Sequence, residues 1–243
     1  TTLLLQAANQ YQSSVSLNSL DANSYADLGG IYAIFYYSQA QSGQTGQQDY
    51  HQKAIEAMER AEKLKPYDTK VRNSLLVNMA MMGEIDKSIE QTEWAIKINP
   101  NDINAYEAKG KLLWDATKHY LDQKDYDNAA KYARQAAAVE TQINKHRQKV
   151  KADSPLWHGA KLDPTPQLTL NIAQAQYLLG QYQQSITKLE PFIKNGTPIP
   201  EAYAWYAADL YRLGQQGKAR QVINTNPQQT QTYTAIIKQG PLK

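Results

Sequence analysis

The chain has 243 residues, of which 42% are hydrophobic and 20% are charged, and its formal net charge is +3. This length allows a substantial core, and so mild a positive charge gives no reason to expect nucleic-acid binding. The chain has no Cys, which excludes disulfides, thiolate metal sites and a cysteine nucleophile. No apolar run reaches the length of about eighteen residues that a membrane span needs, so we expect none within the chain.

The first segment, residues 1–21, places Ala7, Tyr11 and Ser14 in helical register. It predicts a single orphan helix, the remainder of a truncated preceding repeat. The first residue is Thr, and no basic stretch precedes Leu3–Leu5, so we expect no intact signal peptide.

Three helix pairs are predicted over residues 22–151, with insertions at about 36–49 and 116–124. The first insertion is rich in Gln, Ser and Gly, which favours a protruding loop or a helix extension. The second lengthens both helices of the third pair, whose second helix should continue to about Val150.

The second pair has the clearest pattern. Residues 69–82 carry an apolar stripe and end at Gly83, because glycine readily takes the left-handed conformation after a helix. Residues 85–98 form the partner helix, and Pro100 stops it. A linker follows the third pair at 152–165, two further pairs occupy 166–226, and residues 227–243 form a capping segment.

One constant period relates these pairs. Pro66 recurs as Pro100, and Gly180 recurs as Gly214, at the same spacing along the chain. This spacing matches the period of about 34 residues that is typical of stacked helix–turn–helix units. No such unit could bury its apolar stripe alone, so the pattern predicts a continuous stack.

With this pattern the chain resembles the tetratricopeptide repeat family. The resemblance implies an all-α fold, a right-handed superhelix of antiparallel helix pairs, that is, an α-solenoid. Pair by pair, the matching residues are Tyr25, Leu28, Gly29, Tyr32, Ala54, Met58, Ala61 and Pro66; Leu75, Gly83, Ser88, Ala95 and Pro100; Tyr106, Gly110, Leu113, Tyr126, Ala129, Ala133 and Ala136; Ile172, Ala173, Gly180, Tyr182, Ser185 and Leu189; and Tyr203, Tyr206, Ala207, Leu210, Gly214 and Ala219.

The sequence has none of the common catalytic patterns: no Walker-type loop, nucleophile elbow or zinc-binding His-Glu-x-x-His. Its four histidines are scattered, and surface exposure explains His146 and His158 better than a shared site. Carboxylates such as Glu56 and Glu59 have Lys or Arg three or four residues away, as on solvated helix faces. We therefore expect no enzyme activity, no cofactor and no metal.

The resemblance implies that the first helix of each pair lines a concave groove for an extended peptide or a sugar chain. For Trp114 and Tyr177 the alternative is packing between repeats. The expected groove residues are Lys70, Asn73, Val77, Met81, Asn104, Glu107, Lys111, Trp114, Gln174, Tyr177, Tyr211 and Arg212, with Ala80, Asp115 and Gln167 beside them.

The segment Lys145–Lys151 carries four basic residues and is followed by Leu156 and Trp157. Such a segment can contact an anionic membrane surface. The alternative is a solvated helix end, whose cations are stabilised by the macrodipole. The lengthened helices of the third pair suggest docking or homodimer formation.

A weaker resemblance concerns the parent protein. Residues 19–28 look like part of the repeat tail of bacterial O-antigen ligase or polymerase-like membrane proteins. It implies a membrane-associated scaffold of surface-polysaccharide assembly, with any ligase or polymerase activity outside this segment. The alternative is a free-standing soluble adaptor or regulator that binds a peptide of its partner. A glycan-processing accessory enzyme is a third interpretation, which the lack of a clustered carboxylate pair disfavours.

Overall fold

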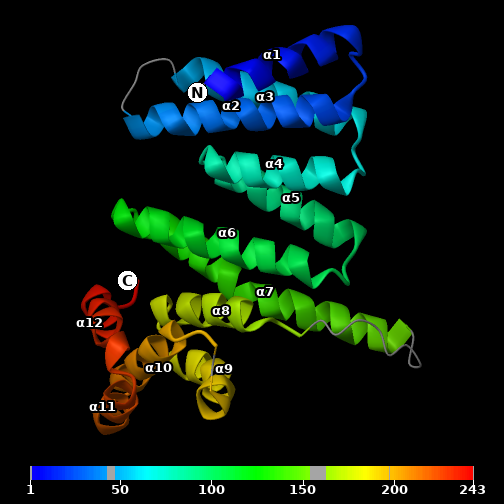
Figure 1. Cartoon of the computed structure of the whole chain (residues 1–243). Coiled ribbons are helices and arrows are strands. Elements are labelled where there is room, and N and C mark those ends of the chain that lie inside the picture. Colours follow the sequence, from blue (N-terminus) through cyan, green and yellow to red (C-terminus); the bar gives the residue numbers. More distant parts are fainter. Residues whose placement is uncertain (1, 43–46, 154–162, 197, 243) are drawn as a thin grey trace. The chain divides into compact units, whose positions relative to one another are not determined.

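The computed structural model describes residues 2–42, 47–153, 163–196 and 198–242 (Figure 1). Over these residues the secondary structure is entirely helical, with twelve α-helices, one short 3₁₀ helix and no strand. Helices adjacent in the chain pack as antiparallel pairs, so the fold is an all-α solenoid, as predicted. The chain divides into two compact units, Thr1–Lys97 (unit 1) and Ile98–Lys243 (unit 2), which are described separately.

In unit 1, α2 packs against α1, α3 and α4. The helices of this unit are α1 (Thr2–Leu17), α2 (Ala22–Ser42), α3 (Gln47–Leu64), α4 (Thr69–Met81) and α5 (Ile85–Ile98), the last ending at the boundary. The predicted helix at 85–98 is confirmed, and α4 ends one residue before the predicted Met82.

Helices α2 and α3 approach closely at Gly29. A Cβ atom added there would lie 2.8 Å from Met58 Cγ and 3.3 Å from the carbonyl oxygen of Ala54. Met58 and Ala54 are both fully buried. The small residue of the repeat pattern is therefore required by the contact between the two helices of a pair.

The insertion expected at about 36–49 is largely helical. Helix α2 continues to Ser42 and α3 begins at Gln47, with residues 43–46 outside the described part. The ring of Tyr50 on α3 stacks on Phe35 of α2, with 5.1 Å between centroids. Aromatic packing thus extends this pair beyond the usual repeat length.

Arg72, on α4, is a buried cation that the repeat pattern does not predict. Its guanidinium pairs with the carboxylate of Glu62 and donates a 2.7 Å hydrogen bond to Gln91 Oε1. It also donates to the carbonyl oxygen of Pro66 and lies 4.2 Å from the centre of the Trp94 ring. One side chain therefore connects α3, α4 and α5.

In unit 2, α6 pairs with α7, α8 with α9, and α10 with α11, while α12 packs against α10. The helices of this unit are α6 (Ile103–Asp122), α7 (Tyr126–Asp153), α8 (Pro166–Leu178), α9 (Tyr182–Asn195), α10 (Glu201–Arg212), α11 (Gln216–Thr225), the 3₁₀ helix Pro227–Gln229 and α12 (Thr230–Gln239). Helices α6 and α7 have 20 and 28 residues, as the second insertion predicts.

The linker predicted at 152–165 falls inside unit 2, where α7 and α8 pack against each other. The boundary between the two compact units comes after Lys97, and the linker stays a prediction. Residues 154–162 of the linker lie outside the described part. Gly110 of α6 faces α8 rather than its own partner helix, because a Cβ atom there would collide with Leu168 Cδ1.

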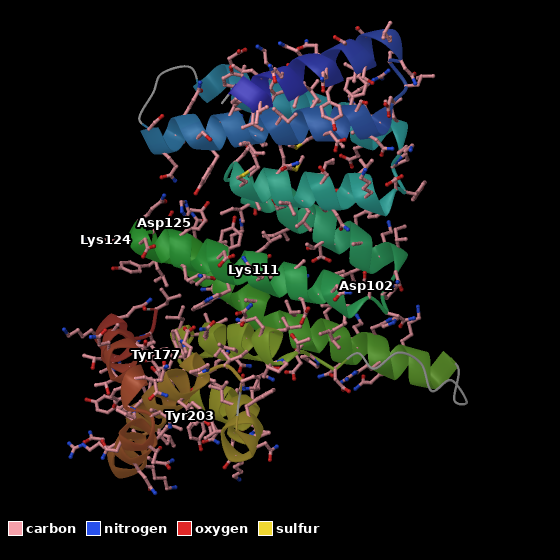
Figure 2. The ribbon with its side chains drawn as sticks, in the orientation of Figure 1. Asp102, Lys111, Lys124, Asp125, Tyr177 and Tyr203 are labelled. Carbon is pink, nitrogen blue, oxygen red and sulfur yellow. The ribbon has the colours of Figure 1, made fainter. Side chains whose placement is uncertain are left out.

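The turns that follow α4, α6, α8 and α10 share one hydrogen-bond pattern. After α8, the Gln181 amide donates to the Gln176 carbonyl and the Gly180 amide to the Tyr177 carbonyl, a Schellman motif. Glycine holds the left-handed position in three of these turns, but Lys124 holds it after α6, with φ of 60° (labelled in Figure 2). The repeat is therefore preserved in backbone geometry where the sequence signal is lost.

Candidate functional site

Two adjoining cavities along α6, α8 and α10 form one groove in unit 2. Their volumes are about 940 Å³ and about 260 Å³, and Lys111, Gln167 and Asn171 line both. The larger cavity is lined in addition by Trp114, Asp115, Lys118, Leu121, Asp122, Tyr126, Gln174, Glu201, Trp205 and Lys238–Leu242, and the smaller by Asn104, Glu107, Ala108 and Leu168.

Aromatic rings form the apolar part of the groove. Trp114 of α6 and Trp205 of α10 meet edge to face, with 5.8 Å between ring centroids. Trp205 also packs edge to face on Tyr177 of α8, at 5.3 Å. The tryptophans are 8% and 5% exposed, so each presents only an edge to a bound group. Trp114 packs between helices and also lines the cavity, so the two interpretations given for it are compatible.

Carboxamides from one face of α8 form a polar wall. Gln167, Asn171 and Gln174 are spaced by four and three residues, which places them on one face of a helix. Gln167 Nε2 donates to Asn171 Oδ1 at 3.0 Å. Gln174 Nε2 and Trp205 Nε1 both donate to Glu201 Oε1, at 3.0 and 2.9 Å.

Gln174 has one hydrogen-bond acceptor in this wall that no donor in the described part of the chain reaches. The side chain is 2% exposed, and its Oε1 is buried without a hydrogen-bond partner among the described residues. A buried acceptor of this kind normally has a donor, so within the described ranges this oxygen is an unsatisfied polar group in the wall of the groove.

The charges at the rim are paired with one another. Asp115 accepts hydrogen bonds from Lys111 at 2.6 Å and Lys118 at 2.9 Å. Burial alone would raise the pKa of Asp115, but the hydrogen bonds from these two lysines outweigh it and hold the pKa below its usual range. Asp115 is therefore ionised at neutral pH, and the rim selects no single sign of charge.

The structure brings five of the twelve predicted groove residues together. Lys111, Trp114 and Gln174 line the larger cavity, and Asn104 and Glu107 line the smaller one with Lys111. The carboxylate of Glu107 accepts a hydrogen bond from the Thr165 hydroxyl, just before α8. Lys111 lies on α6 in Figure 2.

Tyr177 packs between helices, as the alternative given for it predicts, and Arg212 is bonded to it. Tyr177 is fully buried; its hydroxyl donates to the Ile236 carbonyl at 3.3 Å and accepts from Arg212 Nε at 3.1 Å. Arg212 Nη2 donates to the Ile237 carbonyl at 2.7 Å. Burial raises the pKa of Tyr177, so the phenol stays neutral. These side chains hold α12 against α8 and α10 instead of meeting a partner, and the half-buried Tyr211 does not line the cavities.

The remaining predicted residues lie on α4 in unit 1. Lys70, Asn73 and Val77 are exposed, and Met81 is half-buried against the core of that unit. They are described apart from the groove because they belong to the other unit. Their assignment to a binding surface stays a prediction.

Sequence reasoning missed Asn171, Glu201 and Trp205. The repeat could have found Glu201, because it comes one full period after the predicted Gln167. Trp205 comes one full period after Asn171, but neither of these two residues follows from a predicted one. The segment Lys238–Leu242, which also lines the larger cavity, has no counterpart in the period.

The basic segment is described only in part. Arg147 forms an ion pair with Asp163, and His146 Nε2 lies 2.9 Å from Asn101 Oδ1. The side chains of Val150 and Lys151, together with Leu156, Trp157 and His158, lie outside the described residues.

Over the described ranges, every helix is too short or too polar to cross a bilayer. No group of three or more His, Asp or Glu side chains in the same ranges could hold a metal ion.

Comparison with known proteins gives one short match. No family model matches the chain. Over 84 residues it is 32% identical to tetratricopeptide repeat protein 7A of Homo sapiens, a match that covers 35% of this chain and 10% of that protein. The chain therefore corresponds to only a small part of this relative. The match agrees with the helix pairs, the shared turns and the period in indicating a chain similar to tetratricopeptide repeat proteins.

Proposed function

We propose that the chain is a non-catalytic protein-interaction scaffold whose groove in unit 2 holds an extended peptide segment of a partner. The observation that carries the proposal is the carboxamide row of α8 beside the two tryptophans. A carboxamide offers both donors and an acceptor, so it can pair with main-chain N–H and C=O groups of any sequence. The tryptophan edges supply apolar contact for a side chain.

A second feature favours a peptide over a sugar chain. The chain's own non-helical residues Gly240–Leu242 follow α12 and line the larger cavity. The Leu242 amide donates a main-chain hydrogen bond of 2.7 Å to the Leu178 carbonyl at the end of α8. The groove is thus compatible with non-helical polypeptide.

The carboxylates that an acid–base reaction would need are already engaged. Asp115 is held ionised by two lysines, and the Glu107 carboxylate accepts a hydrogen bond from the Thr165 hydroxyl. Asp115 stays ionised at neutral pH, and both carboxylates already accept hydrogen bonds, which supports binding rather than catalysis.

Selection from a phage-displayed library of random peptides tests the proposal, with affinities then measured by fluorescence anisotropy. Gln167→Ala, which removes the exposed carboxamide of the row, should weaken selected peptides about tenfold, the effect of losing one or two hydrogen bonds. Gln183→Ala, an exposed carboxamide of α9 outside the groove, is the matched control. Equal effects of the two substitutions, or groove-dependent binding of oligosaccharides in place of peptides, would refute the peptide assignment.

The cellular setting rests on sequence resemblance alone. We propose from residues 19–28 that the scaffold is part of a bacterial membrane protein of surface-polysaccharide assembly, with a soluble adaptor as the alternative. Immunoblotting of fractionated source cells tests this: a membrane band well above 27.4 kDa supports the first, and a soluble band near 27.4 kDa supports the second. The homodimer and the anionic-surface contact near Lys145–Lys151 likewise stay predictions.

A further inference from the structure

The end of the groove next to α12 is occupied by the chain itself. Helix α12 packs against α10 (Figure 1). The residues that end it and follow it, Lys238–Leu242, line the larger cavity. Leu242 is half-buried against the apolar cluster that contains Trp114 and Trp205. A short non-helical segment therefore already makes the kind of contact proposed for a partner peptide.

The hydrogen bond of Leu242 completes the C-terminal end of α8. The last four carbonyls of a helix have no partner within the helix. In α8, the turn satisfies those of Ala175, Gln176 and Tyr177 through the amides of residues 179, 181 and 180. The fourth, of Leu178, accepts from the Leu242 amide at 2.7 Å. Because Leu178 is fully buried, its carbonyl needs a donor, and a main-chain N–H supplies one.

Different contacts hold α12 and the segment after it. The last turn of α12 is fixed by hydrogen bonds from Tyr177 and Arg212 to the carbonyls of Ile236 and Ile237. Gly240 then turns the chain with φ of 69°, a conformation that favours glycine. Beyond it, Pro241 is exposed and Leu242 is half-buried. The segment can therefore leave the groove without unfolding α12.

We infer that Gly240–Leu242 is an internal ligand, and that a partner reaches this part of the groove by displacing it with an extended segment of the same chemistry. The partner segment presents a main-chain N–H to the Leu178 carbonyl and a leucine-sized side chain to the tryptophan cluster. This inference rests on the proposed function. It adds where the partner segment lies, at the Leu178 carbonyl, and which segment of the chain competes with it, Gly240–Leu242. The tether holds the internal segment at an effective concentration in the millimolar range, so only a tighter segment displaces it.

Opening the site in the full chain tests the inference. Leu242→Asp removes the apolar anchor, and Leu20→Asp, at a leucine 69% exposed in unit 1, is the matched control. The probe is a fluorescein-labelled, amidated peptide with the sequence of residues 238–243. Its anisotropy should show binding to Leu242→Asp at least about tenfold tighter than to the unaltered chain or the control, because a docked segment lowers apparent affinity by the fraction of sites that it leaves open.

A second variant keeps the test independent of the new aspartate. Gly240→Ala places a Cβ where φ is 69° and 3.3 Å from Arg212 Nη2, which should release the segment and increase peptide binding. Circular dichroism establishes that both variants stay folded. Equal binding by the opened and unaltered chains, or no binding of the peptide to either, would overturn the inference.

The two proposals fail in different ways. If library-selected peptides depend on Gln167 but bind Leu242→Asp and the unaltered chain equally, the internal ligand is refuted and the scaffold stands. If the library yields no groove-dependent peptide and the opened variants bind no tail peptide, both are refuted.

Discussion

A buried carboxyl in α10 should make the stability of unit 2 depend on pH. Asp209 is fully buried, and its Oδ2 accepts a 2.5 Å hydrogen bond from the Ser185 hydroxyl. Its Oδ1 is buried without a partner in the described part of the chain. Burial, only partly offset by the bond from Ser185, raises the pKa of Asp209 from 3.8 to about 8. The carboxyl is therefore largely protonated in the folded state at neutral pH.

The sign and size of the effect follow from the two pKa values. Between about pH 4 and pH 8 the folded state holds a proton that the unfolded state has released, so raising the pH favours unfolding. The free energy of unfolding should fall by about 1.4 kcal/mol per pH unit within this window. From pH 5 to pH 7 the loss is about 3 kcal/mol, a large share of the roughly 5–15 kcal/mol that stabilises a typical domain.

Asp209→Asn removes the titration while keeping the shape of the side chain. The amide leaves a buried N–H in place of the carboxyl, a pH-independent cost of about 1–3 kcal/mol. Urea unfolding followed by circular dichroism at pH 5, 6 and 7 gives the comparison. The stability advantage of the native chain over Asp209→Asn should shrink by about 3 kcal/mol from pH 5 to pH 7.

The control is Asp115→Asn, since the pKa of Asp115 lies below its usual range and produces no such slope in this window. If the native chain and Asp209→Asn lose stability in parallel from pH 5 to pH 7, the reasoning about Asp209 is wrong.

Three further changes probe the repeat itself by urea unfolding. Lys124→Gly should stabilise by about 1 kcal/mol, because φ of 60° strains a residue with a Cβ; unchanged stability would contradict this. Gly29→Ala should destabilise the fold by about 1–3 kcal/mol, because the new Cβ would lie 2.8 Å from Met58 Cγ. Gly217→Ala should stabilise it by up to about 1 kcal/mol, because the new Cβ would have no atom within 4 Å. The same sign for both substitutions would refute the packing argument. Arg72→Ala should cost about 3 kcal/mol and stay costly in high salt, as expected for a buried charge but not for a surface ion pair.

The fold could be predicted because its signals recur. The constant period and a glycine after the first helix of a pair identify helix–turn–helix units even where single residues differ. Lys124 replaces the glycine that would predict the turn after α6 from the sequence. The turn forms nevertheless, because the packing on either side outweighs a local strain of about 1–2 kcal/mol. The network of Arg72 could not be predicted in the same way, because its partners come from three helices with no fixed spacing.

The groove was predictable where it follows the repeat. Lys111, Trp114 and Gln174 lie on first helices of pairs, where the repeat pattern predicts them, and all three line the larger cavity. Tyr177 occupies an equivalent position but is buried, because α12 packs over it and accepts a hydrogen bond from its hydroxyl. That contact depends on a helix outside the period, so no pattern within the repeats reports it.

The same helix limits how a partner can lie in the groove. Bonds from Tyr177 and Arg212 fix α12 at the end next to α10, and Gly240–Leu242 extends from it to the end of α8. We propose that a peptide that takes the place of Leu242 at the Leu178 carbonyl continues away from α12. In that direction it passes the carboxamides of α8 and reaches the smaller cavity, where Lys111, Gln167 and Asn171 join the two. Substitutions in the smaller cavity should therefore weaken long selected peptides and leave a short tail peptide unaffected.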